Sequence, residues 1–166
     1  MRKVLAFIVC FACFGAAAND MQSEGSWFFK TKVNKMTDTT DMVASNATKD
    51  VYTRQGSERY TSLVLRCKEN ETDAYISVYD YLGSGEPRIT VRFDDGKPVK
   101  QTWNSSEGGS AAFSPNAISF IKELAKHKKV IIGFEPYGST MQAVEFDLSG
   151  TDKVAAKIAE SCNWKL

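Results

Sequence analysis

The chain has 166 residues, and its 21 basic and 20 acidic side chains give a formal net charge of +1. Such a balanced charge provides no general attraction to nucleic acid or to an anionic membrane, so we expect neither as a partner. A single histidine and four cysteines leave few groups for metal binding or nucleophilic chemistry.

Residues 1–18 have the pattern of a secretory signal peptide. Two basic residues precede an apolar run at 4–14, and Ala16 and Ala18 form an A-x-A cleavage pattern. The run is too short to span a bilayer, which takes about 20 residues as a helix. We therefore predict an exported protein that is cleaved after Ala18.

The alternative for this terminus is a lipoprotein acylated on Cys13. Ala12 has a suitable size, but Cys10 and Phe11 replace the aliphatic and small residues usual before such a cysteine. We favour cleavage, which leaves residues 19–166 as a single domain with a net charge of −1 and no transmembrane segment.

The mature chain is predicted to be mostly antiparallel sheet. Alternating apolar residues and turn signals indicate strands at 26–34, 41–48, 61–67, 73–80, 88–93, 97–103, 129–137 and 141–149. We expect a loop at 48–59 and a small, flexible segment at 105–112. Strand hairpins combined with two helices predict an α+β fold, built as a mainly antiparallel sheet or sandwich.

The register of the hairpin at 88–103 follows from its side chains. A two-residue turn at Asp95 and Gly96 would pair charged residues with apolar ones. A three-residue turn, with Gly96 left-handed, sets Val91 opposite Val99 and gathers Ile89, Val91, Phe93, Val99 and Trp103 on one face. We adopt the second register.

Two segments have helical spacing. Ser114 and Pro115 suit an N-cap and first helical position, and the stripe after them is Ala117, Ile118, Ile121, Leu124 and Ala125. A second helix is expected from about Thr151, after Gly150 breaks the preceding strand.

The two cysteines of the mature chain, Cys67 and Cys162, both point toward the core. Cys67 shares a strand face with Leu65, and Cys162 follows Ile158 at helical spacing. In an exported protein such a pair is expected to form a disulfide. A redox-active or metal-binding pair is the alternative, but it lacks a CxxC motif and a nearby histidine.

The residues indicate no catalytic, cofactor or metal site. His127 stands among lysines at a helix end, where a satisfied surface residue is expected. The glycine-containing segments at 83–85 and 108–110 are too short for a phosphate loop. The alternative is a hydrolase with a carboxylate pair drawn from Asp80, Asp94, Asp95 and Glu135.

The best candidate for a binding surface is a cationic strip formed by Arg88, Arg92 and Lys100. The chosen register places all three on the face opposite the apolar residues; a solvated sheet face is the other interpretation. Tyr75, Tyr79 and Tyr81 share one face of the neighbouring hairpin, where they either form an interface or cover the core.

Several ordered motifs resemble the VasI/TagO family of periplasmic accessory proteins encoded with type VI secretion systems. They are LVLRCKENETDAYISVYDYLG, the VRFDDGKP turn, Trp103, FIKEL, EPYG, FDLSG and the terminal CNW. The resemblance covers Trp27 to Trp164 and implies an exported, non-enzymatic envelope protein with paired Cys67 and Cys162. The segment 37–41 departs from the family pattern, which leaves open a diverged, prophage-type relative.

Together, these features predict a periplasmic binding protein without a cofactor. Its expected partner is another envelope protein or peptidoglycan, contacted through the cationic strip. The hydrolase with a carboxylate pair remains the alternative.

Overall fold

The computed structural model describes residues 21–166, so the predicted signal peptide and Cys13 lie outside the described residues. The elements are β1 (Gln22–Glu24), β2 (Trp27–Asn34), β3 (Thr39–Ala47), β4 (Tyr52–Arg54), β5 (Ser57–Arg59), β6 (Thr61–Lys68), β7 (Glu71–Val78), β8 (Arg88–Phe93), β9 (Val99–Thr102), β10 (Asn104–Ser105), β11 (Ala111–Phe113), α1 (Ala117–Leu124), β12 (Lys129–Phe134), β13 (Gln142–Asp147) and α2 (Thr151–Ser161).

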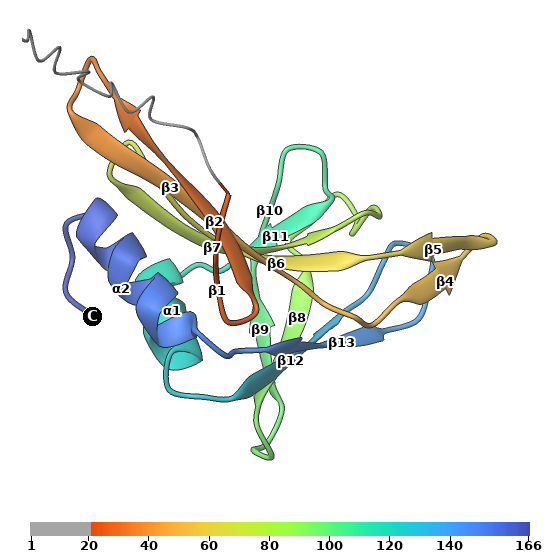
Figure 1. Cartoon of the computed structure of the whole chain (residues 1–166). Helices are drawn as coiled ribbons and strands as arrows, with labels where there is room; N and C mark the ends of the chain where they lie inside the picture. The colour runs from red at the N-terminus through yellow and green to blue at the C-terminus, as the bar shows by residue number, and fades with distance from the viewer. Residues whose placement is uncertain (1–20) are drawn as a thin grey trace, which may run out of the picture.

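The strands form two main antiparallel sheets. One has seven strands in the order β1-β2-β3-β6-β7-β11-β10, the other has four in the order β13-β12-β8-β9, and β4 and β5 form a separate hairpin. Both helices and the four-stranded sheet lie on the same side of the seven-stranded sheet (Figure 1). The predicted α+β class with two helices is confirmed.

The core lies where these layers meet. Alternation along each strand turns one face inward, so that Leu65 of β6 and Ile132 of β12 are fully buried, as is Ile158 of α2. The Trp27 indole donates a buried hydrogen bond of 2.8 Å to Thr151 Oγ1, which joins β2 to the start of α2. One continuous core therefore stabilises both sheets and both helices.

The disulfide predicted between Cys67 and Cys162 is present, with a Cα–Cα distance of 5.7 Å. Cys67 is fully buried on β6, and Cys162 caps the C-terminus of α2. The predicted strand and helix faces are both confirmed. The bond anchors the last helix to the central part of the seven-stranded sheet.

The two sheets meet along β13 through side chains rather than a strand ladder. Asn46 Nδ2 donates to the Asp147 carbonyl at 2.6 Å, and Thr48 Oγ1 donates to the Glu145 carbonyl at 2.7 Å. The Glu145 N–H donates to the Asp50 carboxylate at 2.6 Å. Residues at and just after the end of β3 thus satisfy outward-facing backbone groups of β13.

The predicted loop at 48–59 is wrong, because it contains the β4–β5 hairpin. Gln55 and Gly56 both have positive φ, 50° and 76°, which a tight two-residue hairpin turn requires. The segment at 105–112 likewise includes parts of β10 and β11, and β1 was not predicted. β1, β4, β5 and β10 have mixed polar sequences without the alternation that marks a half-buried strand, and β11 has only three residues.

The β8–β9 register is confirmed, since Val91 pairs with Val99. The turn differs from the prediction, because Asp94 has the positive φ of 44° and Gly96 does not. Asp94 is held by hydrogen bonds from the backbone N–H groups of Lys128 and Lys129. Val99 is 54% exposed instead of joining the buried face, because it lies on the edge strand of its sheet.

The first helix begins later than predicted, at Ala117. Its N-cap is Asn116, which makes no side-chain capping hydrogen bond. The predicted N-cap at Ser114 and first helical position at Pro115 are therefore wrong. The buried face is Phe120, Ile121 and Leu124, whereas Ile118 is 39% exposed. The second helix begins at Thr151 as predicted, after Gly150 in the left-handed conformation.

Candidate functional site

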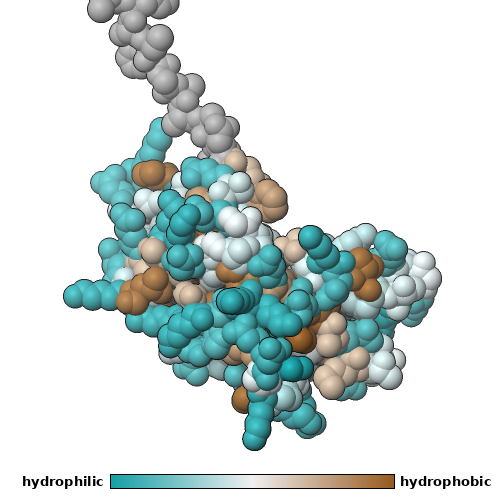
Figure 2. Space-filling view, turned by 60° about the horizontal axis from the view of Figure 1, so that its bottom comes forward, coloured by the Kyte–Doolittle hydropathy of each residue, from teal (hydrophilic) through white to brown (hydrophobic). Residues whose placement is uncertain are grey.

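The cationic strip lies on the outer face of the four-stranded sheet. On β8, Arg88 and Arg92 alternate with residues that point into the core, and Lys100 on β9 stands opposite Thr90. The register therefore brings the three cations to one face, as the sequence predicts. Figure 2, which turns the lower edge of Figure 1 forward, shows a mainly hydrophilic face with scattered hydrophobic residues.

The three cations differ in exposure and in hydrogen bonding. Arg88 and Lys100 are exposed, whereas Arg92 is half-buried and its Nε donates to the Gly96 carbonyl at 3.0 Å. Among the ion pairs of residues 21–166, none uses these three side chains. The strip thus has guanidinium and ammonium groups available to an external anion, with Arg92 also supporting the turn.

A cluster of carboxylates surrounds the histidine. His127 Nδ1 lies 2.8 Å from Asp94 Oδ2, and Nε2 lies 3.1 Å from Glu123 Oε1. The Asp94 hydrogen bond is the main cause that raises the pKa of His127, and the same bond lowers the pKa of Asp94. The ring also stacks on Phe93, with 4.6 Å between centroids.

Both ring nitrogens of His127 are therefore engaged, so neither is free to accept a proton from a nucleophile in this arrangement. The cluster instead ties the β8–β9 turn to α1. The sequence prediction of a satisfied histidine agrees with this geometry, but its partners were not identified. The Glu123 contact could have been predicted from the sequence, because Glu123 precedes His127 by four residues on a helical segment.

The hydrolase interpretation depends on carboxylates that have other partners here. Asp80 forms an ion pair with Arg54 at 3.2 Å and accepts the Tyr81 N–H at 2.8 Å. Asp94 is bound to His127 and two backbone N–H groups, and its pKa is lowered, whereas a glycosidase acid needs a raised pKa. Asp95 and Glu135 are exposed. The geometry does not favour Asp80 and Asp94 as a catalytic pair.

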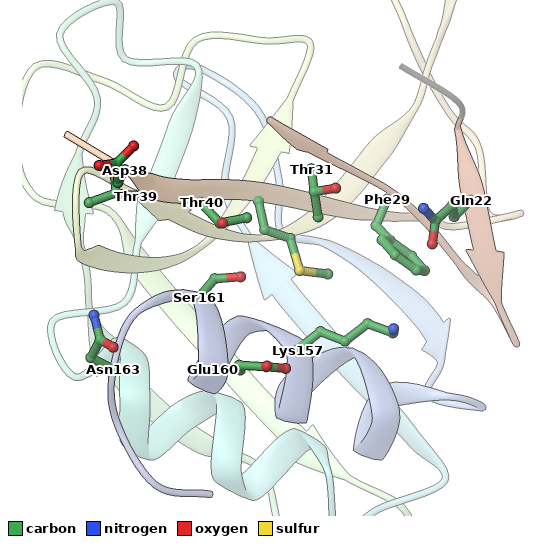
Figure 3. Close-up of a pocket in the computed structure, with 11 residues that line it drawn as sticks. Gln22, Phe29, Thr31, Asp38, Thr39, Thr40, Lys157, Glu160, Ser161 and Asn163 are labelled. Carbon is green, nitrogen blue, oxygen red and sulfur yellow. The ribbon is translucent and has the colours of Figure 1, made fainter. Parts of the chain in front are cut away.

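A groove that the sequence did not indicate lies between the β2–β3 hairpin and α2, with a volume of about 470 Å³. Figure 3 shows Lys157, Glu160 and Ser161 of α2 across from residues of β2 and β3. Lys157 Nζ lies 5.5 Å from the centroid of the Phe29 ring, a cation–π contact. Along residues 21–166, no group of three His, Cys, Asp or Glu side chains is placed to hold a metal ion.

No helix among the described residues has the length and apolar character needed to cross a membrane.

Residues 21–166 form an α+β fold of antiparallel sheets and two helices, with the Cys67–Cys162 disulfide joining α2 to β6. The chain belongs to the family described as Type VI secretion system VasI, EvfG, VC_A0118, whose model matches residues 16–164. Membership confirms the family resemblance of the sequence motifs and associates the chain with type VI secretion. No curated protein sequence matches the chain.

The fold also occurs in a solved structure of different sequence. The crystal structure of invasion-associated protein B from Bartonella henselae matches with a TM-score of 0.55 at 11% identity. The match covers 84% of this chain and 95% of that chain. At this low identity, the similarity concerns the fold alone.

Proposed function

We propose that this protein is a periplasmic accessory protein of a type VI secretion system. In this role it binds an envelope protein or peptidoglycan and catalyses no reaction. Membership of the VasI family over residues 16–164 is the observation that carries the proposal. The signal-peptide pattern at 1–18 and the Cys67–Cys162 disulfide support an oxidising compartment outside the cytoplasm.

The cationic strip is the surface proposed to contact an acidic partner. Arg88 and Lys100 are exposed and, within residues 21–166, make no ion pair. A carboxylate of a partner can therefore bind them without displacing a carboxylate of this protein. Charge complementarity of this kind mainly accelerates association. Each exposed pair contributes only about 0 to 1 kcal/mol and is screened by salt, so binding should weaken as ionic strength rises.

The test is affinity capture of the tagged mature protein from the periplasm at low and high salt. The variant Arg88→Glu with Lys100→Glu reverses two exposed charges, and it avoids the hydrogen bond that Arg92 makes to the turn. A matched control, Lys30→Glu with Lys32→Glu, makes the same charge change on exposed residues of β2.

Loss of captured partners in the strip variant but not in the control is the expected result, with the thermal midpoint unchanged. If the strip variant captures every partner as well as the wild type at low salt, the strip is only a solvated face. If the strip variant does lose partners, Arg88→Glu with Arg92→Glu separates the arginines from Lys100, because it leaves the lysine in place; its thermal midpoint must be compared as well, since Arg92 also holds the turn.

A further inference from the structure

Four exposed tyrosines lie outside the cationic strip, near the end of the β6–β7 ladder and in the loops that follow β7 and β12. We call this set, Tyr60, Tyr79, Tyr81 and Tyr137, the tyrosine surface. Tyr79 and Tyr137 are each 67% exposed, and the rings of Tyr81 and Tyr137 are 5.7 Å apart. Tyr60 and Tyr79 flank the last pair of the β6–β7 ladder, Thr61 with Val78. By contrast, Tyr75 stacks on Phe113 at 4.4 Å and covers its own sheet.

Backbone hydrogen bonds hold the loops of this surface together. The Tyr137 N–H donates to the Tyr81 carbonyl at 2.7 Å, and the Leu82 N–H donates to the Gly109 carbonyl at 2.8 Å. Arg54 of β4 donates to the Tyr137 carbonyl at 2.6 Å, which joins the β4–β5 hairpin, at the right of Figure 1, to the same cluster. A backbone ordered in advance reduces the entropic cost of binding.

One glycine is needed for this arrangement. Gly109 has φ +64°, and a Cβ there would lie 2.5 Å from a carbon of the Tyr81 ring. Any other residue must push the ring aside. The close approach therefore fixes the place of Tyr81 in the tyrosine surface.

The loops at 79–87, 105–110 and 135–141 have the sequences YDYLGSGEP, SSEGGS and EPYGSTM. Tyrosine, serine and glycine dominate them, as in antibody paratopes, where tyrosine supplies rigid amphipathic contact area and small residues supply adaptable hydrogen bonds. Their charged residues are all acidic. Asp80 is paired with Arg54, whereas Glu86, Glu107 and Glu135 are exposed.

We propose that the tyrosine surface binds a second protein through a segment rich in arginine or lysine. Guanidinium groups stack on tyrosine rings, and the three exposed glutamates complement their charge. The inference rests on the proposed function only in treating this chain as a binding protein. The cationic strip suits an acidic surface, so the two surfaces require partner segments of opposite charge.

The experiment is site-specific photo-crosslinking in cells that carry the native secretion genes. The photoreactive amino acid p-benzoylphenylalanine replaces Tyr79 or Tyr137 in the full chain, and a control places it at Val33, which is 60% exposed on β2. Mass spectrometry then maps the crosslinked peptide. We expect a protein adduct, specific to the tyrosine positions, within a segment rich in arginine or lysine.

Reversing Glu86, Glu107 and Glu135 to lysine should lower the crosslink yield about tenfold, which corresponds to about 1.4 kcal/mol shared among three exposed charge pairs. Gly109→Ala should lower it as well, with thermal midpoints measured to confirm that both variants fold. Arg88→Glu with Lys100→Glu should leave it unchanged, which separates this proposal from that for the strip. A glycan adduct, an acidic target segment, the same adducts as at Val33, or no adduct would each overturn the proposal.

Discussion

Removing the disulfide tests how much of the stability depends on joining α2 to β6. In Cys67→Ala with Cys162→Ala, the unfolded chain regains the freedom of a loop of 95 positions. The chain-entropy model assigns about 4.7 kcal/mol to closing such a loop, an upper value where the unfolded chain is compact. Typical domains have a free energy of unfolding of about 5 to 15 kcal/mol, so the expected loss of about 2 to 5 kcal/mol is a large share.

Urea unfolding of the purified mature protein, followed by tryptophan fluorescence, measures this loss. With a slope of about 2 kcal/mol per molar urea, a loss of 4 kcal/mol moves the midpoint down by about 2 M. Reduction of the wild type should produce the same shift. The double variant serves as the control, because a reductant should leave its midpoint unchanged.

The reasoning fails if the double variant loses less than about 1 kcal/mol. In that case the unfolded chain would already be compact enough for the bond to restrict little, or the core contacts of α2 would hold the helix in place without it. A larger slope in the variant than in the wild type would favour the entropic explanation, since it reports a more expanded unfolded state.

Three further predictions concern particular side chains. Asn46→Ala leaves the Asp147 carbonyl without its 2.6 Å donor and should cost about 1 to 3 kcal/mol in urea unfolding. The pKa of His127 is raised in the folded protein above its unfolded value of 6.5. The stabilisation from its charged form is therefore complete below pH 6.5 and is lost as the pH rises through the folded pKa. Over that pH range, the difference in unfolding free energy between wild type and His127→Gln should shrink. Gly150→Ala puts a Cβ 2.5 Å from the Glu24 carbonyl oxygen at φ +80° and should lower stability by about 1 to 3 kcal/mol from backbone strain alone, measured by the thermal midpoint.

The periodicity of apolar residues was sufficient to predict the long strands and the second helix from the sequence. Leu65 and Cys67 could be assigned to a buried face, and Ile158 and Cys162 to the facing helix, because both patterns repeat without interruption. The β4–β5 hairpin was missed because its six strand residues are mostly polar and its core contact is a single ring, that of Tyr52.

Of the surface features, only the cationic strip could be predicted, because the pairing of two neighbouring strands determines it. Arg88 and Lys100 lie where the hairpin register put them, because that register depends on neighbouring strands. The positive φ of Asp94 depends on N–H groups of Lys128 and Lys129, over thirty positions away. The groove of Figure 3 depends on how α2 sits against β2 and β3, which no local pattern specifies.

The side-chain seam along β13 also bears on self-association. β13 is an edge of the four-stranded sheet, and an open edge offers backbone groups to which another chain can add a strand. Asn46, Thr48 and Asp50 already occupy such groups at Glu145 and Asp147. A second copy of the chain therefore cannot add a strand to this edge without first displacing three hydrogen bonds. These bonds protect the edge against aggregation by strand addition.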